Sequence, residues 1–391
     1  MITDTALTRL RPLYATAFLQ GYGLWFSIDK LFMRSIGFDD RKIALATVVY
    51  VATMSITNTP SGILADRWSR KGVLHLATLA LIASSLICGV SHSFGTYTFG
   101  MALWAVCYSC YGGTYESIVY DMLIEETGSA EHFEQYFGRV NVYNAAAFIC
   151  SALVSSVVAA HYPLRIEYLA TIPVSCLALL TVHRLREPQL HLASPAASLG
   201  AHLGDICKAI SSSRRLVWVV LAMTTNLAAL RFLTEFSQLW LIALVVPAVL
   251  FGPAFALLYG GIMAGNWLAY RLSKVLLVAA ITLVAGGVLL VHLATAVVLA
   301  QGVAITGICA VDIILCRFLH DSLPSRVRAG AASLVLTLAY TAFIPLALAF
   351  GWLADRDGIA RASLLPLATL LTMVLALVMA LSAKEAPHEA S

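Results

Sequence analysis

The chain has 391 residues, of which 60% are hydrophobic and 12% are charged, and its formal net charge at pH 7 is +4. Soluble domains carry about 25% charged residues, so this composition excludes a soluble globular protein. The positive charge is small and dispersed, which gives no reason to expect a nucleic acid as a partner. Apolar runs of about 18 to 25 residues can cross a bilayer as helices, so we predict an all-α integral membrane protein.

Taken in chain order, apolar runs separated by charged or Pro/Gly breaks predict twelve transmembrane helices. They cover approximately residues 12–35, 43–65, 72–91, 96–121, 140–160, 166–183, 216–240, 248–270, 275–296, 298–318, 329–353 and 363–383. The one long connection is polar and partly amphipathic. It predicts an amino-terminal six-helix bundle (1–184), a cytoplasmic linker (185–215) and a carboxy-terminal six-helix bundle (216–391).

The distribution of basic residues predicts the orientation. An even number of spans places both termini on one side, and most of the 25 Lys and Arg residues fall in the segments on that side. Cytoplasmic loops carry an excess of Lys and Arg, so we expect both termini in the cytoplasm and the protein in the cytoplasmic (inner) membrane.

The charged loop after the second span has a partial copy in the second half of the chain. LADRWSR at 64–70 corresponds to LAYRLSK at 268–274, which follows the eighth span. Leu, Ala, Arg and Ser are identical, and the last position is basic in both. A repeat at equivalent places indicates two pseudo-symmetric halves.

This loop resembles the signature loop of the major facilitator superfamily of transporters. Three stretches carry the resemblance: Gly62-x-x-x-Asp66-Arg67-x-x-Arg70-Lys71 between the second and third spans, Tyr120-Asp121 at the end of the fourth, and LPSRVRAGAAS (323–333) at the start of the eleventh. The resemblance implies two six-helix bundles and transport by alternating access.

In that family the loop acts as a conformational latch. The resemblance implies that Asp66 lies near the amino end of the eleventh helix, where a carboxylate is favoured, and that Arg70 pairs with Asp121. The predicted latch residues are Gly62, Asp66, Arg67, Arg70, Lys71 and Asp121. The alternative is that the basic residues are only positive-inside anchors. Ser69 stands where the family usually has a second glycine.

Motifs for other functions are missing from the sequence. No G-x-x-x-x-G-K-[ST] loop is present, so a secondary transporter is expected instead of one with its own nucleotide site. No nucleophile, base and acid form an enzyme motif, so we expect no enzyme activity. Cys107 and Cys110 form the only C-x-x-C and have no second ligand pair, so we expect neither a metal site nor a cofactor.

Ionisable residues inside predicted spans are costly in lipid and therefore mark candidate functional sites. They occur in spans one, four, seven and ten, which line the central cavity in the family that this chain resembles. The residues are Asp29, Lys30, Glu116, Arg231, Glu235 and Asp312.

Arg231 and Asp312 lie within about one turn of the predicted midplane, so we expect both to face the substrate, with Asp312 as a proton site. A static ion pair that only joins their two helices is the alternative. Asp29 and Glu116 are further candidates for the substrate or proton site. Glu116 precedes Asp121 by about one turn and alternatively belongs to the latch.

Lys30 and Glu235 suggest an external gate, because the first and seventh helices approach each other on the outer side when this fold is inward-facing. The simpler alternative pairs Arg231 with Glu235 at i, i+4 on one helix.

We therefore predict proton-coupled export of a small organic molecule, a drug or a metabolite, by a monomer whose partners are the substrate, protons and the lipid bilayer. Uptake by symport is the first alternative, because the fifth span, NVYNAAAFICSALVSSVVAA at 141–160, lacks the Gly-Pro motif usual in drug/proton antiporters of the family. A transporter-like membrane sensor is the second alternative.

Overall fold

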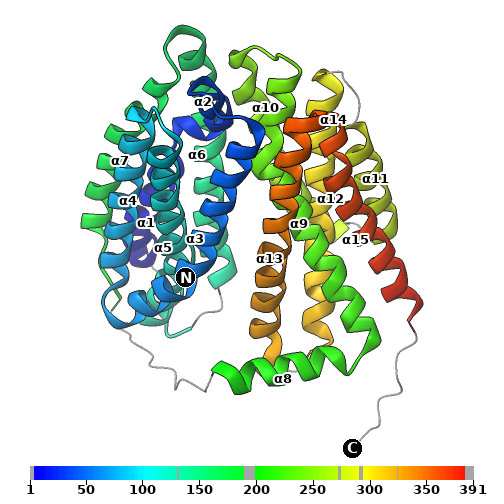
Figure 1. The fold of residues 1–391 in the computed structure, drawn as a ribbon. Coiled ribbons are helices and arrows are strands. Elements are labelled where there is room, and N and C mark those ends of the chain that lie inside the picture. The colour runs from blue at the N-terminus through cyan, green and yellow to red at the C-terminus, as the bar shows by residue number, and fades with distance from the viewer. Residues whose placement is uncertain are drawn as a thin grey trace, which may run out of the picture. The chain divides into compact units, whose positions relative to one another are not determined.

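The computed structural model describes residues 4–129, 132–188, 199–271, 274–289, 294–323 and 325–383. Within these ranges every regular element is a helix (Figure 1). Nine of the described helices are long and apolar enough to cross a membrane, and Val275–Val288 is a shorter apolar helix. The all-α prediction is confirmed.

The first half of the chain contains these helices: α1 (Asp4–Gly21), η1 (Leu24–Ser27), α2 (Asp29–Ser35), α3 (Asp40–Arg67), α4 (Arg70–Val90), α5 (Phe94–Thr127), α6 (Phe133–His161) and α7 (Arg165–Arg184). The second half contains α8 (Leu199–Ser211), α9 (Arg214–Ala243), η2 (Ala248–Leu250), α10 (Phe251–Leu268), η3 (Ala269–Arg271), α11 (Val275–Val288), α12 (Ala294–Asp321), α13 (Ser325–Asp357), α14 (Ile359–Ala362) and α15 (Leu364–Ser382). A helix lies at each predicted span, although 290–293 in the ninth fall outside the described residues.

The first predicted span is broken in the structure. The helix stops at Gly21, continues as the short 3-10 helix η1 and resumes as α2. A Cβ at Gly21 would lie 2.7 Å from Asn144 Nδ2, and a Cβ at Gly23 would lie 2.5 Å from the Phe26 ring. Both glycines therefore permit close packing at the break, which a hydropathy pattern does not register.

Side-chain caps begin several helices. Asp39, Ser69, Ser93 and Ser213 each accept a hydrogen bond from the backbone N–H three residues later, at the starts of α3, α4, α5 and α9. Such caps satisfy donors that a helix start leaves without an intrahelical partner. At the end of α5, Gly128 adopts a left-handed conformation with φ of 71°, which glycine tolerates without strain.

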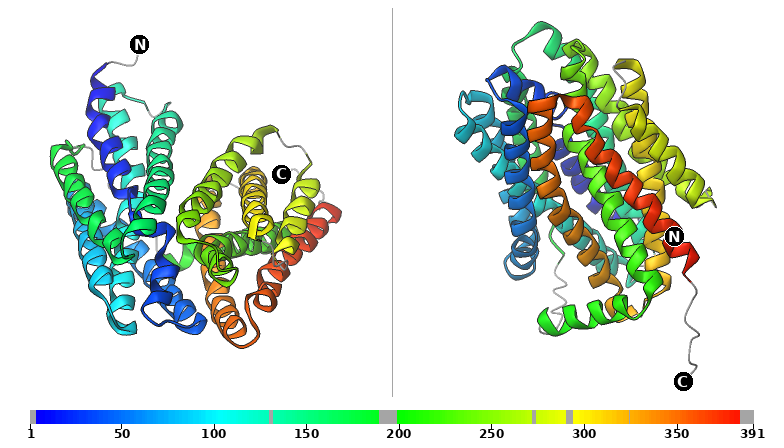
Figure 2. Two further views of the ribbon diagram at one scale, coloured as in Figure 1. Left: turned by 90° about the horizontal axis from the view of Figure 1, so that it is seen from above. Right: turned by 45° about the vertical axis from the view of Figure 1, so that its right-hand side comes forward.

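The chain forms two compact units. Unit 1 comprises Met1–Ala193 and Val246–Tyr259, and unit 2 comprises Ser194–Val245 and Gly260–Ser391. The predicted division into bundles and linker stays a prediction, because 189–198 lie outside the described residues. Part of the predicted linker is the helix α8, which runs across the ends of α9 and α13 (Figures 1 and 2).

Unit 1 packs α4 against α5 and α7, and α3 against α5. Its core includes Trp25 of η1, whose ring stacks on Tyr168 of α7 at a centroid distance of 5.1 Å. In unit 2, α9 contacts α12, α13 and α15. Phe232 and Phe236 of α9 pack on Phe350 of α13. These aromatic clusters hold the helices that carry the candidate residues.

Candidate functional site

The beginning of α4 meets α5 through an ion pair. Arg70 donates from Nη1 to the Asp121 carboxylate and to the Ser117 carbonyl oxygen, the latter at 3.1 Å. The Arg70 and Asp121 side chains are only 12% and 6% exposed. The structure thus brings these two predicted residues together inside unit 1, while the latch role itself stays a proposal.

Glu187 also contacts the beginning of α4, and this contact was not predicted from the sequence. It follows the end of α7 and accepts hydrogen bonds from Ser69 Oγ at 2.7 Å and from the backbone N–H groups of Arg70 and Lys71. Lys71 Nζ in turn donates to the His183 carbonyl oxygen at 2.6 Å. A carboxylate at the positive amino end of α4 is electrostatically favourable. The only sequence signal was an acid directly after the sixth span.

The other predicted latch residues contribute less to the described contacts. Gly62 has open space where a Cβ would stand, and Arg67 is exposed in the last turn of α3. Asp66 also lies in that turn, and its side chain is outside the described part of the structure. The predicted contact of Asp66 with the eleventh helix therefore stays a prediction.

One turn beyond Asp121, α5 is also joined to α1. Arg9 donates from Nη1 to Glu125 at 3.1 Å and to Glu126. The hydrogen bond to Glu126 is the largest of the effects that raise the pKa of Arg9. Ion pairs therefore connect α5 with both α1 and α4 near its carboxyl end.

Glu116 stands apart from this network. Its side chain is exposed on α5, and the described contacts of Arg70 are with Ser117, Asp121 and Glu187. Membership of Glu116 in the latch therefore gains no support from these contacts.

Asp29 and Lys30 form a buried pair in α2, directly after the break in the first span. Lys30 Nζ lies 2.8 Å from Asp29 Oδ2, and the Lys30 backbone N–H donates to Asp29 Oδ1, also at 2.8 Å. Lys30 is 1% exposed and Asp29 is 7% exposed. One partner of Lys30 is thus its own chain neighbour.

Arg231 bridges α9 and α13 in unit 2. It contacts Glu235, one turn later in α9, at 3.1 Å, and donates from Nη2 to the Tyr340 hydroxyl at 2.8 Å. Its guanidinium also lies over the Tyr340 ring, 4.8 Å from the centroid. The i, i+4 pairing is formed, and among the described residues no ion pair joins Arg231 to Asp312.

Asp312 in α12 carries a buried oxygen without a partner. Its Oδ1 accepts no hydrogen bond from the described residues. Asn226 of α9 donates from Nδ2 to the Ile308 carbonyl oxygen, one turn before Asp312 in α12, at 3.0 Å. An ionised carboxylate in such a place is costly, because burial removes part of its hydration and no basic side chain in the described part of the chain forms an ion pair with it.

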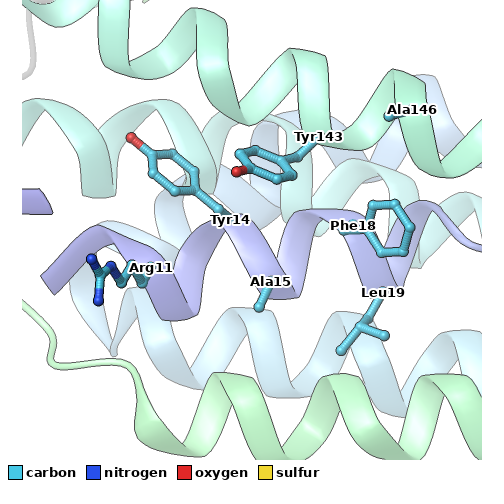
Figure 3. A pocket seen from close by; sticks show the side chains of 7 residues that line it. All are labelled: Arg11, Tyr14, Ala15, Phe18, Leu19, Tyr143 and Ala146. Atoms are coloured by element: carbon cyan, nitrogen blue, oxygen red, sulfur yellow. The ribbon is translucent and has the colours of Figure 1, made fainter. Parts of the chain in front are cut away.

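A cavity of about 530 Å³ lies between α1 and α6 of unit 1. Figure 3 shows Arg11 at one end of it and Phe18 with Leu19 at the other, while Tyr14 lies beside Tyr143. The two tyrosine rings stack at a centroid distance of 5.3 Å. None of these residues was predicted from the sequence, since aromatic residues near span ends are most often interfacial anchors.

The chain matches a known protein family over most of its length. The sequence profile described as the Major Facilitator Superfamily matches residues 12–332. A search of curated protein sequences finds no match.

Several solved structures are similar in fold. The nucleoside transporter NupG superposes with a TM-score of 0.75 at 16% identity, covering 98% of this chain and 100% of that one. A bacterial homolog of the human lysosomal transporter Spinster, inward-facing and unoccupied, gives 0.73 at 13% identity, with 98% of each chain covered. A D-xylose-proton symporter gives 0.70 at 11% identity, covering 94% of this chain and 96% of that one. At these identities the likeness concerns the fold.

Proposed function

The chain belongs to the major facilitator superfamily, and on this premise we propose that it is a proton-coupled secondary transporter of a small organic molecule. Membership makes it a multi-pass membrane protein with the twelve-helix fold that works by alternating access. It is a transporter and not an enzyme, as predicted. The substrate, the coupling ion and the direction are the proposed part.

The observation that carries proton coupling is the unpartnered oxygen of Asp312. Asp312 is partly buried, so an ionised carboxylate there carries a desolvation cost, which binding a proton removes. A coupled transporter must also release the proton. In alternating access, water reaches the site from one side at a time, and hydration of Asp312 favours release of the proton to that side. Asp312 is therefore our proton site.

Arg231 is our candidate for orienting the substrate. Glu235 and Tyr340 fix its guanidinium in one direction, which prepares it to bind an anionic or polar group with little further loss of side-chain freedom. Asp29 and Glu116 stay candidates for the same path. An external gate of Lys30 with Glu235 requires both residues to exchange the partners they have here, Asp29 and Arg231.

The aromatic cavity beside Arg11 supports an organic substrate. Tyrosine and phenylalanine rings offer faces to planar molecules, and Arg11 adds one positive charge at the end of the cavity. Aromatic carboxylates are therefore the first compounds to test.

Export through the cytoplasmic membrane, with both termini in the cytoplasm, is the arrangement we propose from the distribution of basic residues and the compact chain. Proton-coupled uptake is the second candidate. It is favoured by the structural likeness to a protein named as a D-xylose-proton symporter.

Proteoliposomes that contain a pH-sensitive dye test both the coupling and its direction. An inward gradient of each compound, from a panel of aromatic carboxylates, nucleosides, sugars and cationic drugs, is applied without a pH gradient. Symport acidifies the lumen, whereas antiport makes it alkaline. A pH change that persists in Asp312→Asn removes the proton-site assignment, and Asp321→Asn, which alters an exposed acid, is the matched control. No flux of any compound would favour the sensor.

A further inference from the structure

Unit 1 contains a second buried acid, Glu167, in the first turn of α7. Its side chain is 0% exposed. One carboxyl oxygen, Oε2, accepts a hydrogen bond from Ser155 Oγ of α6. The other, Oε1, is buried and has no hydrogen-bond partner in the described part of the chain. The function proposed above makes no use of this group.

The charged and titratable groups around α7 do not neutralise Glu167. Near the start of α7 they are Arg165 and Tyr168 of α7 itself, with Tyr97 of α5, Cys88 of α4 and Asp29 of α2 interacting with Tyr168. Cys176, His183 and Arg184 lie two turns or more further along α7. Lys30 pairs with Asp29, and the Tyr97 and Tyr168 hydroxyls bond to each other at 2.8 Å. Within the described residues Glu167 makes no ion pair with a basic side chain.

Two electrostatic effects on Glu167 oppose each other: the amino end of α7 favours its charged form, and burial favours its neutral form. An acid in the first turn of a helix is stabilised in its charged form by the helix dipole, but this effect is small. Burying an ionised carboxylate without a cation costs more free energy than the dipole returns. A neutral acid with one unsatisfied O–H loses less than the buried ion does. The protonated form is therefore the cheaper one here.

Hydrogen bonds connect this acid to the break in the first span. Ser27, the last residue of η1, donates from Oγ to Ser155 Oγ at 2.7 Å, and Ser155 donates to Glu167. The backbone N–H of Leu24, at the start of η1, donates to Thr171 Oγ1 of α7 at 3.1 Å. Packing of η1 on α6 and α7 completes the arrangement. A negative charge on Glu167 would thus arise one side chain away from η1, at the break in the first span.

We propose that Glu167 is a proton-binding site of unit 1, whose protonated carboxyl holds the broken segment of the first span against α6 and α7. The proton comes from water and forms an O–H bond on the carboxylate. This site is separate from Asp312, which lies in the other unit. It can be tested without knowing the substrate.

Infrared spectroscopy of the purified full-length protein in nanodiscs tests the site directly. A protonated carboxyl has its own carbonyl stretching band, which we expect at neutral pH in the wild type and which Glu167→Gln should reduce. Asp321→Asn, at an exposed acid, should leave this band unchanged. Ser155→Ala should keep the band and shift its frequency, because it removes the hydrogen bond to Oε2 while Glu167 stays in place.

Hydrogen exchange tests the link to the break. After correction for the intrinsic pH dependence of exchange, protection of residues 22–29 should fall in the wild type at alkaline pH, where the carboxyl loses its proton. Glu167→Gln mimics the neutral acid and should stay protected. An equal loss of protection in both proteins would overturn the link, and no band change in either Glu167→Gln or Ser155→Ala would overturn the proton site itself.

Discussion

Replacing Asp121 by Asn should strongly destabilise unit 1. The substitution keeps the size of the side chain and one acceptor oxygen, but it removes the negative charge that faces Arg70. The guanidinium would keep its hydrogen bond to the Ser117 carbonyl oxygen and lose its ionic contact with Asp121. Asp121→Asn therefore isolates the charge of this contact from its shape.

The magnitude follows from the burial of the pair. Both side chains are largely shielded from water, at 12% and 6% exposure, so solvent screens their attraction poorly. Losing a hydrogen bond between charged groups costs about 1.5–3 kcal/mol, and removing one partner of a buried ion pair costs about 3–5 kcal/mol. The Ser117 carbonyl oxygen still accepts a hydrogen bond from Arg70 in the variant. We therefore expect the free energy of unfolding to fall by about 3 kcal/mol, the lower end of the second range.

The assay is the unfolding midpoint in detergent micelles with increasing denaturant, followed by tryptophan fluorescence. Asp321→Asn is the matched control, since its ion pair with Arg317 is 72–85% exposed and should contribute no more than about 1 kcal/mol. Equal midpoints for Asp121→Asn and Asp321→Asn would refute the reasoning. A double variant with Arg70→Gln should recover part of the loss, because it removes the buried positive charge that Asp121 faced.

Three further changes test other contacts. Glu187→Gln removes the charge that accepts from Ser69 and two backbone groups, and should lower the free energy of unfolding by about 1 kcal/mol and the midpoint with it; an unchanged midpoint would contradict the capping role. Asp29→Asn removes the charge that Lys30 Nζ contacts and should lower the free energy of unfolding by about 1.5–3 kcal/mol, whereas Asp29→Asn with Lys30→Met should be milder; a double variant as unstable as the single one would argue against this account. Tyr340→Phe keeps the ring over Arg231 but loses its hydroxyl, so substrate flux should fall while folding is retained; unaltered flux would remove the orienting role of Tyr340.

Local rules explain why the helical class could be predicted from the sequence. A bilayer requires each spanning segment to be apolar for its own length and to satisfy its backbone internally, so hydropathy alone locates the helices. The partnership of Arg70 with Asp121 was predicted through the family resemblance, and the two side chains meet in the structure. The pairing of Arg231 with Glu235 was accessible because four residues make one helical turn.

Contacts between distant segments could not be predicted by such local rules. Ser69 and Glu187 are 118 residues apart in sequence, and only the folded chain places the end of α7 beside the start of α4. Glu167 looks like any acid at the edge of a span until the packing of η1, α6 and α7 removes it from water. The break at Gly21 likewise depends on the close approach of Asn144.

The sequence by itself thus determined the membrane class, the helical segments and the charged loop that identifies the family, because the membrane constrains each segment separately. Only the tertiary structure decided which charges have partners and which do not. Asp29, Lys30, Arg231 and Glu235 have ionic partners, whereas Asp312 and Glu167 each keep a buried oxygen without a hydrogen bond among the described residues. Burial and pairing are properties of the packed helices, and these properties set the cost of charge.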